Sequence, residues 1–497
     1  MDPITRALGP LAPVLKRFAA GRPGLYLAGG AVRDALLGRR VGDADIAVAT
    51  GSAMTAGRSF ADMAGGALVI LGNRRLARVH LPGATVDFTP LKGRDITADL
   101  NRRDFTVNAI AVPIPWSNPP VLVDPTGGRR DLASRRLRLA YPGAFRDDPV
   151  RLWRGLRIME EFGLKPDAAF SRRLKADARL AAACTPERLR DELFKLFRLA
   201  RSARALAGAL RSGVLCATFP AMSSMIRVKV PRGGSIDVMK HTLEAYAALE
   251  RIAAKPRAVF GKEAVAATGH LVLEPVAGRT RLSLLKLAIL LHDTAKPSCV
   301  GRDPDGDVHF IGHEAAGARI ASDLMRVKLK CSEAEIAIVA SVIRLHLRPG
   351  YLAAVTSKAG GRRTAFAASA GKAGAQISDR AAYRFIKAAG EELYELVLHS
   401  QADRMATHHG RAVTAASQDR VLARILAFRR KMNARIPGKR LLTGHDVMRE
   451  FGIKPGPDVG LALKAVEEGV ALGRVGTREE ALKAAQKALD RPKSRMI

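Results

Sequence analysis

The chain contains 497 residues, 47% of them hydrophobic, and carries a formal net charge of +35. This length predicts several domains, and the charge favours RNA or DNA over a membrane as partner, although a general preference for arginine in the source genome would give the same excess. The four cysteines lack Cys-x-x-Cys spacing, which argues against a zinc site or a disulfide framework. The sequence contains no run of about twenty apolar residues, the length that a membrane span needs. We therefore expect a cytoplasmic protein with no membrane partner.

The N-terminal region alternates short strands and helices. We expect an amphipathic helix within residues 1–20, in place of a signal peptide. Short strands are expected at 25–28, 45–49, 68–71, 79–81 and 85–88, with a helix at 31–37 that Gly38 ends. This alternation predicts an α+β head over residues 1–140.

Beyond the head, apolar residues recur with helical spacing, which predicts all-α domains. Pro231 and Gly233-Gly234 mark a boundary, so we expect a neck over 141–232 and a second helical domain over 235–410. A helical tail is expected over 411–497. Residues 356–378 are rich in Ala, Gly, Lys and Arg and lack apolar periodicity, which predicts a mobile basic insertion.

A glycine turn followed by two alternate aspartates predicts phosphate chemistry in the head. Gly29 and Gly30 follow the first predicted strand, and Asp43 and Asp45 stand at the second. Residues two apart on a strand point to the same face, so both carboxylates can reach the same metal ions. Glycine lets backbone amides approach a triphosphate closely. Each half alone is common in turns, but together they predict a nucleotidyl-transfer site.

Asp87 is a candidate third carboxylate. It lies on a predicted strand among apolar neighbours, where an acid is unusual unless it has a partner. Two hypotheses remain open: an acid of the metal site, or a polar residue at a strand edge. Mg²⁺ suits such a site, because it prefers oxygen ligands and substrate phosphates. One ion would activate the attacking hydroxyl and a second would neutralise the triphosphate.

Two arginine-rich segments follow. Arg102 and Arg103 stand among acidic residues, where guanidinium groups can hold phosphate while their neighbours orient them. The second segment places a charged residue at every third position of a predicted helix: Asp148, Arg151, Arg154 and Arg157. An aspartate accepts from an exocyclic amino group and an arginine donates to ring acceptors, so one such pair can read cytosine or adenine. The alternative is a salt-bridged solvent face.

Together these motifs resemble class II tRNA nucleotidyltransferases and bacterial poly(A) polymerases. The similar segments are residues 29–34, 43–45, 102–109, 148–157 and 186–193. The resemblance implies a polymerase-beta-like nucleotidyltransferase head followed by all-α neck, HD and tail domains. It places Mg²⁺ on Asp43 and Asp45, and with Asp87 these form the predicted catalytic set. The implied nucleotide-binding residues are Gly29, Gly30 and Arg33 at the triphosphate, Asp148 and Arg151 at the base, and Arg103, Arg154 and Arg157 at phosphate or sugar.

The second helical domain contains a further candidate metal site. Its members are His241, His292, Asp293, His313, His346 and Asp403. Imidazoles with carboxylates suit a divalent transition metal such as Ni²⁺ or Mn²⁺, although a lone histidine in an apolar helix is usually only packed there. The set resembles HD-family metal-dependent phosphohydrolases. That resemblance implies a metal-activated water that attacks a phosphate ester.

The leading hypothesis is an enzyme that adds CCA, or part of it, to tRNA 3′ ends from CTP and ATP without a template. The neck and tail would supply a basic surface for the tRNA acceptor stem. Residues 89–98 form a shorter connection than in many CCA-adding relatives, where a flexible loop serves the switch from C to A, and this favours a CC-adding specialist. Two further hypotheses stay open: a poly(A) polymerase of the same family, and an enzyme that is mainly an HD phosphohydrolase.

Overall fold

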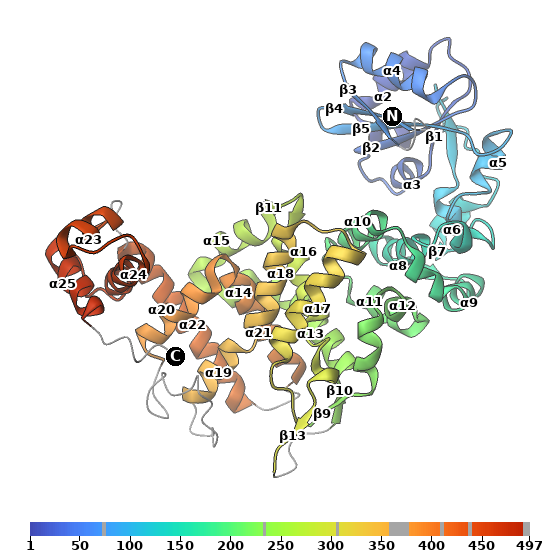
Figure 1. Cartoon of the computed structure of the whole chain (residues 1–497). Coiled ribbons are helices and arrows are strands. Elements are labelled where there is room, and N and C mark those ends of the chain that lie inside the picture. The colour runs from blue at the N-terminus through green and yellow to red at the C-terminus, as the bar shows by residue number, and fades with distance from the viewer. Residues whose placement is uncertain are drawn as a thin grey trace. The chain divides into compact units, whose positions relative to one another are not determined.

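The computed structural model describes residues 1–71, 76–231, 235–304, 308–356, 377–407, 412–435 and 440–490. These residues form two compact units, Met1–Pro220 and Ala221–Ile497, and each is described by itself (Figure 1). Most of the predicted basic insertion, and the predicted boundary at residue 410, lie outside the described residues.

A mixed six-stranded sheet organises the start of the first unit. Its strands, in spatial order, are β3 (Ala67–Leu71), β4 (Leu76–Leu81), β5 (Ala84–Pro90), β2 (Asp43–Val48), β1 (Leu25–Ala28) and β6 (Ala111–Pro113). Strands β2 and β5 run parallel, and every other neighbouring pair is antiparallel. The predicted strands are confirmed within a few residues, whereas the three-residue β6 was not predicted.

Alternation along the central strands separates an apolar face from an acidic one. On β2, Ala44 and Ile46 are buried on one face, while Asp43 and Asp45 lie on the other. The apolar face packs against α2 (Leu11–Ala19) and α4 (Ala53–Ala64). Three aromatic rings fill that contact at centroid distances of 5.1–5.8 Å: Phe18, Phe60 and Phe88. On the acidic face, Asp43 and Asp45 stay exposed, while Ala47 farther along β2 packs against Ile96 and Leu100.

Short helices surround the acidic side of the sheet and lead into a helical neck. They are α1 (Pro3–Leu8), α3 (Gly30–Leu36), α5 (Ile96–Leu100), α6 (Gly128–Ala133) and α7 (Ala144–Asp147). The neck contains α8 (Arg151–Phe162), α9 (Ala168–Ala176), α10 (Pro186–Phe197), α11 (Ala203–Ser212) and α12 (Val214–Thr218). Phe105, from the head, and Phe145 both meet the ring of Phe170, at 6.1 and 5.6 Å. This apolar contact joins head and neck within the unit.

The second unit is almost entirely helical. Its larger helices are α13 (Val238–Ala253), α16 (Arg281–Leu291), α17 (His313–Lys328), α18 (Glu333–Leu345), α19 (Arg348–Thr356), α20 (Asp379–Ala389), α21 (Leu393–Thr407), α22 (Ala412–Arg435), α23 (Gly444–Phe451), α24 (Pro457–Ala471) and α25 (Arg478–Leu489). Helix α16 is buried over nearly its whole length and packs against α13, α18 and α21. Helices α23–α25 enclose a smaller apolar core around Val447, Ala462 and Ala485.

One helical stretch among the described residues, Glu333–Ala353, is long and apolar enough to cross a membrane by length and composition alone. Over its α18 part, Val339, Val342 and Ile343 are fully buried against neighbouring helices. The core helix of a soluble protein passes the same test, so this stretch is weak evidence for a span. The α+β head and the predominantly helical remainder, which adds only two-stranded sheets among the described residues, confirm the predicted fold class.

The packing of head on neck can be tested at Gly155, in the middle of α8. A Cβ atom there would lie 2.8 Å from Phe170 and 3.2 Å from Phe105, both in ring contact. We expect Gly155→Ala to destabilise the first unit by about 1–3 kcal/mol through overpacking, which outweighs about 1 kcal/mol gained in helix propensity. Urea unfolding followed by tryptophan fluorescence reports on this unit alone, because both tryptophans, Trp116 and Trp153, belong to it.

Gly208→Ala, inside α11, is the matched control. Its Cβ would meet the end of the Leu156 side chain at 3.3 Å, and that flexible group can yield. We expect a change within about 1 kcal/mol. Equal stability of the two variants would contradict the close packing at Gly155.

Candidate active sites

Three carboxylates gather on the acidic face of the sheet. Asp45 on β2 stands directly beside Asp87 on the parallel strand β5, and Asp43 lies two residues earlier on β2. Although Asp45 is open to solvent, the protein atoms packed around its carboxylate desolvate it and raise its pKa, and repulsion from Asp87 and Asp43 adds to this. A cation placed among the three acids would relieve that repulsion. The donor set, all oxygen, fits Mg²⁺.

Asp87 has a partner that sequence reasoning missed. Arg78, opposite Asp87 on the antiparallel strand β4, donates from Nε and Nη2 to its two carboxylate oxygens at 2.8 and 2.7 Å. The alternation of side-chain direction along the strand was the available signal for Arg78. Ala77 and Val79 are buried on one face of β4, so Arg78 between them points to the other face, toward the acids. Arg78 therefore balances part of the negative charge.

The glycine turn lies against the same acids. Gly29 links β1 to α3 with a φ of +75°, a conformation that favours glycine. A Cβ at Gly29 would lie 2.6 Å from Arg103 Nη1 and 3.6 Å from Asp45 Oδ2. Arg103 is also tied to Asp99 by a 3.0 Å ion pair. The Gly29 turn therefore contacts both the Arg103 guanidinium and the Asp45 carboxylate. Gly30 follows as the first residue of α3.

Arg33 is engaged within the protein. Its side chain is buried, with Nη1 donating to Asn108 at 2.7 Å and Nε donating to Asp34 at 2.9 Å. The guanidinium carbon also lies 4.1 Å from the ring centroid of Phe162. In this state Arg33 connects α3 to the neck, and its predicted contact with the triphosphate stays a prediction.

Two arginines of α8 are held by buried acids. Arg154 pairs with Asp104 at 3.3 Å and with Glu192 of α10 at 3.5 Å. Arg157 contacts Glu192 at 2.5 Å and also pairs with Glu161. Burial alone would raise the pKa of Asp104, but Arg154 and the Asn108 side chain outweigh it and lower that pKa. This network fixes α8 against the head and against α10.

The predicted base-reading pair is adjacent but not hydrogen-bonded. Arg151 Nε lies 3.7 Å from Asp148 Oδ2, while its Nη1 donates to the Tyr141 hydroxyl at 3.1 Å. Arg188, at the start of α10, donates instead to both oxygens of Asp148, at 2.9 and 2.5 Å. Arg188 belongs to the segment 186–193 that carried the resemblance, although no role was predicted for it.

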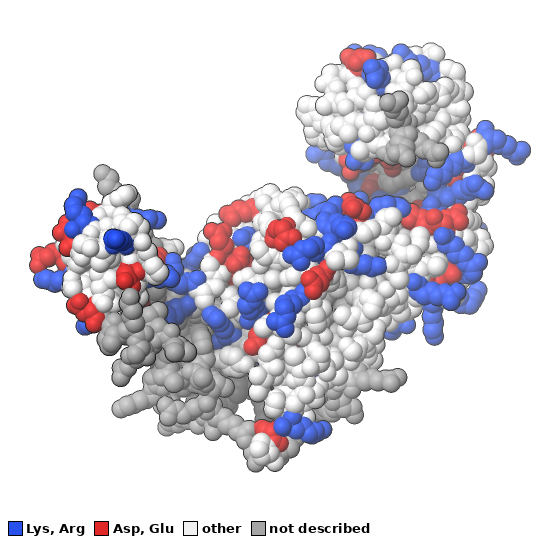
Figure 2. Space-filling view, viewed as in Figure 1, with Lys and Arg blue, Asp and Glu red and all other residues white. Residues whose placement is uncertain are grey.

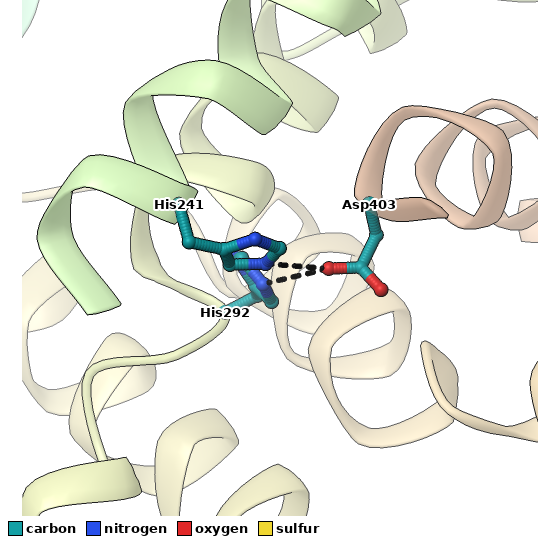
Figure 3. A group of neighbouring side chains, drawn as sticks. All are labelled: His241, His292 and Asp403. Atoms are coloured by element: carbon teal, nitrogen blue, oxygen red, sulfur yellow. Dashed lines mark hydrogen bonds and ion pairs between the residues drawn. The ribbon is translucent and has the colours of Figure 1, made fainter. Parts of the chain in front are cut away.

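The six residues of the second candidate site come together in the second unit. His241 of α13 and His292 after α16 both approach Asp403 Oδ1, at 2.9 and 3.5 Å (Figure 3). His292 Nε2 also lies 3.2 Å from Asp293, and His313 Nε2 lies 3.6 Å from the other Asp293 oxygen. Within each of two groups, all ligand atoms lie within 4.8 Å of one another. The first group is His241, His292 and Asp403, and the second is His292, Asp293 and His346. Either group could hold a cation.

Backbone contacts orient three of these imidazoles. The Nδ1 atoms of His292, His313 and His346 each contact the carbonyl oxygen three residues earlier, at 2.8, 2.6 and 2.6 Å. Such a contact leaves Nε2 as the metal-binding nitrogen. Burial disfavours the charged form of His292, but Asp293 and Asp403 outweigh it and raise its pKa to about 9. Burial lowers the pKa of His346 to about 3. The mixed nitrogen and oxygen donors fit a divalent transition metal.

Two further residues of this cluster were not singled out from the sequence. Lys296 donates to Asp293 at 2.7 Å. His399 of α21 is fully buried beside His292 and His346. The signal for His399 was its spacing, because it precedes Asp403 by four residues and so shares one face of the helix.

Family models match four parts of the chain. They describe a poly A polymerase head domain over residues 25–138, a probable RNA and SrmB-binding site of polymerase A over 163–226, an HD domain over 238–428, and a putative domain 2 of tRNA nucleotidyltransferases over 435–485. The order agrees with the predicted succession of head, neck, HD region and tail.

Curated relatives cover nearly the whole chain. An A-adding tRNA nucleotidyltransferase of Deinococcus radiodurans is 33% identical over 92% of this chain and 94% of its own length. A CC-adding tRNA nucleotidyltransferase of Thermus thermophilus is 31% identical over 91% of each chain. The fold is that of the Thermotoga maritima CCA-adding enzyme complexed with tRNA, at a TM-score of 0.62, 20% identity and 98% coverage of both chains. The chain therefore belongs to the tRNA nucleotidyltransferase family, with an HD domain in its second half.

Proposed function

We propose that this chain adds the nucleotides of the CCA sequence to tRNA 3′ ends, taking them from CTP and ATP in the cytoplasm. One observation carries the proposal: Asp43, Asp45 and Asp87 share one face of the sheet beside the Gly29 turn and Arg103. The relatives named above act, by their names, on tRNA, and they match this chain over nearly its full length.

The acids of the head would hold the cations and the basic groups would hold the triphosphate. Asp43 and Asp45 are the proposed Mg²⁺ ligands, with Asp87 as third acid. Two Mg²⁺ ions bound there would activate the attacking hydroxyl and neutralise the triphosphate. The tRNA 3′ oxygen forms a bond to the α-phosphorus, the bond from that phosphorus to the bridging oxygen breaks, and pyrophosphate leaves. Arg103 and Asp45 both lie against the Gly29 turn, so Arg103 would contact the phosphates there.

Selection of the base falls to Asp148 and Arg151 in this proposal. An exocyclic amino group of cytosine or adenine can donate to Asp148, and Arg151 can donate to a ring acceptor. Arg151 Nε has no hydrogen-bond partner among the described residues, but it is buried, so the side chain must shift before Nε can donate to a base. Arg188 already occupies both oxygens of Asp148, so a base must share that carboxylate with it or displace it. The contacts of Arg154 and Arg157 keep α8 in place during this exchange.

The neck offers a basic surface for tRNA. In Figure 2, Lys and Arg gather on the neck part of the first unit, while the visible face of its sheet region is mostly uncharged. Exposed members on and around α9 are Arg135, Arg136, Arg172, Lys175 and Arg179. Phosphate contacts of this kind read the shape of RNA rather than its sequence. We assign head, neck, HD region and tail to residues 1–140, 141–232, 235–410 and 411–497.

A CC-adding specialist is the second candidate, favoured by the connection between β5 and α5. Lys92 N donates to Asp99 at 2.9 Å, and Asp95 caps α5 by accepting from Ala98 N at 2.8 Å. These bonds close the short connection tightly. Such a connection has little freedom to rearrange between addition of C and addition of A.

Extension of a tRNA that lacks CCA, with Mg²⁺ and with CTP and ATP offered separately and together, tests the transferase. We expect C, C and A to be added, with products resolved at single-nucleotide length. Two C additions without A would establish the CC-adding alternative, and long A tails on any RNA would establish a poly(A) polymerase. Asp45→Asn should slow extension on the order of 10²–10³-fold, because it removes a charge from the cation site. Asp62→Ala, exposed on α4, is the control and should not change the rate.

A phosphohydrolase activity of the HD region is favoured by the convergence of His241, His292 and Asp403. With Ni²⁺ or Mn²⁺ we expect hydrolysis of phosphate esters such as a phosphorylated or cyclic RNA 3′ end. His292→Ala should abolish hydrolysis and leave tRNA extension unchanged, whereas Asp43→Ala should do the reverse. Chelation before assay should remove hydrolysis, and added Ni²⁺ should restore it. Hydrolysis that survives in His292→Ala would assign the activity elsewhere.

A further inference from the structure

His399 is a fully buried imidazole with no hydrogen-bond partner among the described residues. Neither ring nitrogen makes a hydrogen bond, and the side chain has no exposed surface. A neutral imidazole always carries one N–H group, and burying that group unsatisfied costs about 1–3 kcal/mol. Its neighbours on α21 include Leu396 and Leu398, both fully buried, so an apolar residue would suit the packing better. A buried polar group of this kind calls for a water or an ion.

The ring of His399 completes a triangle with two proposed metal ligands. Its centroid lies 5.0 Å from that of His292 and 5.2 Å from that of His346, and the latter two are also 5.2 Å apart. Imidazoles bound to one tetrahedral cation through bonds of about 2.0–2.1 Å have ring centres about 5 Å apart. The three rings therefore have the spacing of a three-histidine site.

The other two imidazoles of the triangle are already oriented for binding. Their Nδ1 atoms contact the carbonyl oxygens of Ile289 and Ile343, which leaves each Nε2 for a cation. Asp293 supplies a carboxylate to the same group, with ligand atoms of His292, Asp293 and His346 within 4.8 Å of one another. His399 stands outside that group as it lies, so coordination requires its ring to turn toward the cation.

We propose that His399 is a further ligand for a divalent transition-metal cation held at His292, Asp293 and His346. The inference rests on the metal site proposed for the HD region. It adds a third imidazole to a ligand set of two histidines and one aspartate, which makes the set richer in nitrogen. Imidazole suits Ni²⁺, Co²⁺ and Zn²⁺, whereas Mg²⁺ prefers oxygen. The site should consequently discriminate against the cation that the head requires, so that one chain keeps two different metals apart.

Cobalt titration of the full-length protein tests the proposal. Metal is first removed by chelation, and excess Mg²⁺ is then added to occupy the oxygen site of the head. Co²⁺ binding is followed by calorimetry and by its visible absorption, which reports the coordination number and the type of ligands around the ion. The variants are His399→Phe, which keeps a ring in the core, and His399→Gln, which keeps a polar group. His445→Phe, exposed on α23, is the matched control.

We expect His399→Phe to weaken Co²⁺ binding by about tenfold or more and to change the absorption bands, with His445→Phe unchanged. A folded His399→Phe protein that binds Co²⁺ with unchanged affinity and spectrum would overturn the proposal. If the wild-type protein binds no Co²⁺, the metal site itself fails, and the inference fails with it.

A direct measurement covers the case in which the variants do not fold. Anomalous scattering from Co²⁺ in crystals of the wild-type protein locates the ion. A His399 nitrogen about 2.1 Å from the ion is the expected result. A separation beyond about 3 Å would refute coordination, because no metal–nitrogen bond is that long.

Discussion

The parallel pairing of β2 with β5 forces carboxylates of like charge side by side on one face of the sheet. Asp45 and Asp87 are paired across the two strands, and Asp43 lies two residues before Asp45 on the same face. Such an arrangement opposes folding unless positive charge compensates it. Arg78 and Arg103 supply part of that charge from the protein. Cations could supply the rest of the compensating charge, and this is the basis for proposing that the three acids are catalytic.

In the second unit, a buried carboxylate is likewise compensated by basic groups around it. Asp293 is fully buried among histidines and Lys296, and these partners lower its pKa well below the usual value although burial opposes this. The histidines enter from the ends or faces of separate helices, so the cluster depends on how α13, α16, α17, α18 and α21 pack. The head exposes oxygen donors beside the Gly29 turn, whereas the second site encloses mainly nitrogen donors. The two sites therefore suit different metals.

Local pattern was sufficient to predict most of the sheet, because alternation and glycine turns are readable in the sequence. Residue type and order in the sequence also picked out the Asp43 and Asp45 pair and the six HD residues, which the structure brings together, while their roles stay predictions. Alternation could have indicated which face Arg78 occupies, but its pairing with Asp87 depends on the register of β4 against β5, which the sequence does not show. The bond from Arg188 to Asp148 joins residues forty positions apart. His399 was hidden because one histidine in an apolar helix is usually only packed.

We propose that Asp43 and Asp45 would hold a cation that neutralises charge on the triphosphate, its α-phosphate included, during transfer. The most direct test compares tRNA extension with CTP and with the separate diastereomers of its α-phosphorothioate. Mg²⁺ binds sulfur poorly, whereas Mn²⁺ and Cd²⁺ accept it. We expect extension with one diastereomer to be strongly slowed in Mg²⁺ and to recover when Mn²⁺ or Cd²⁺ is added. Equal slowing of that diastereomer in all three metals would contradict direct contact between the cation and the α-phosphate.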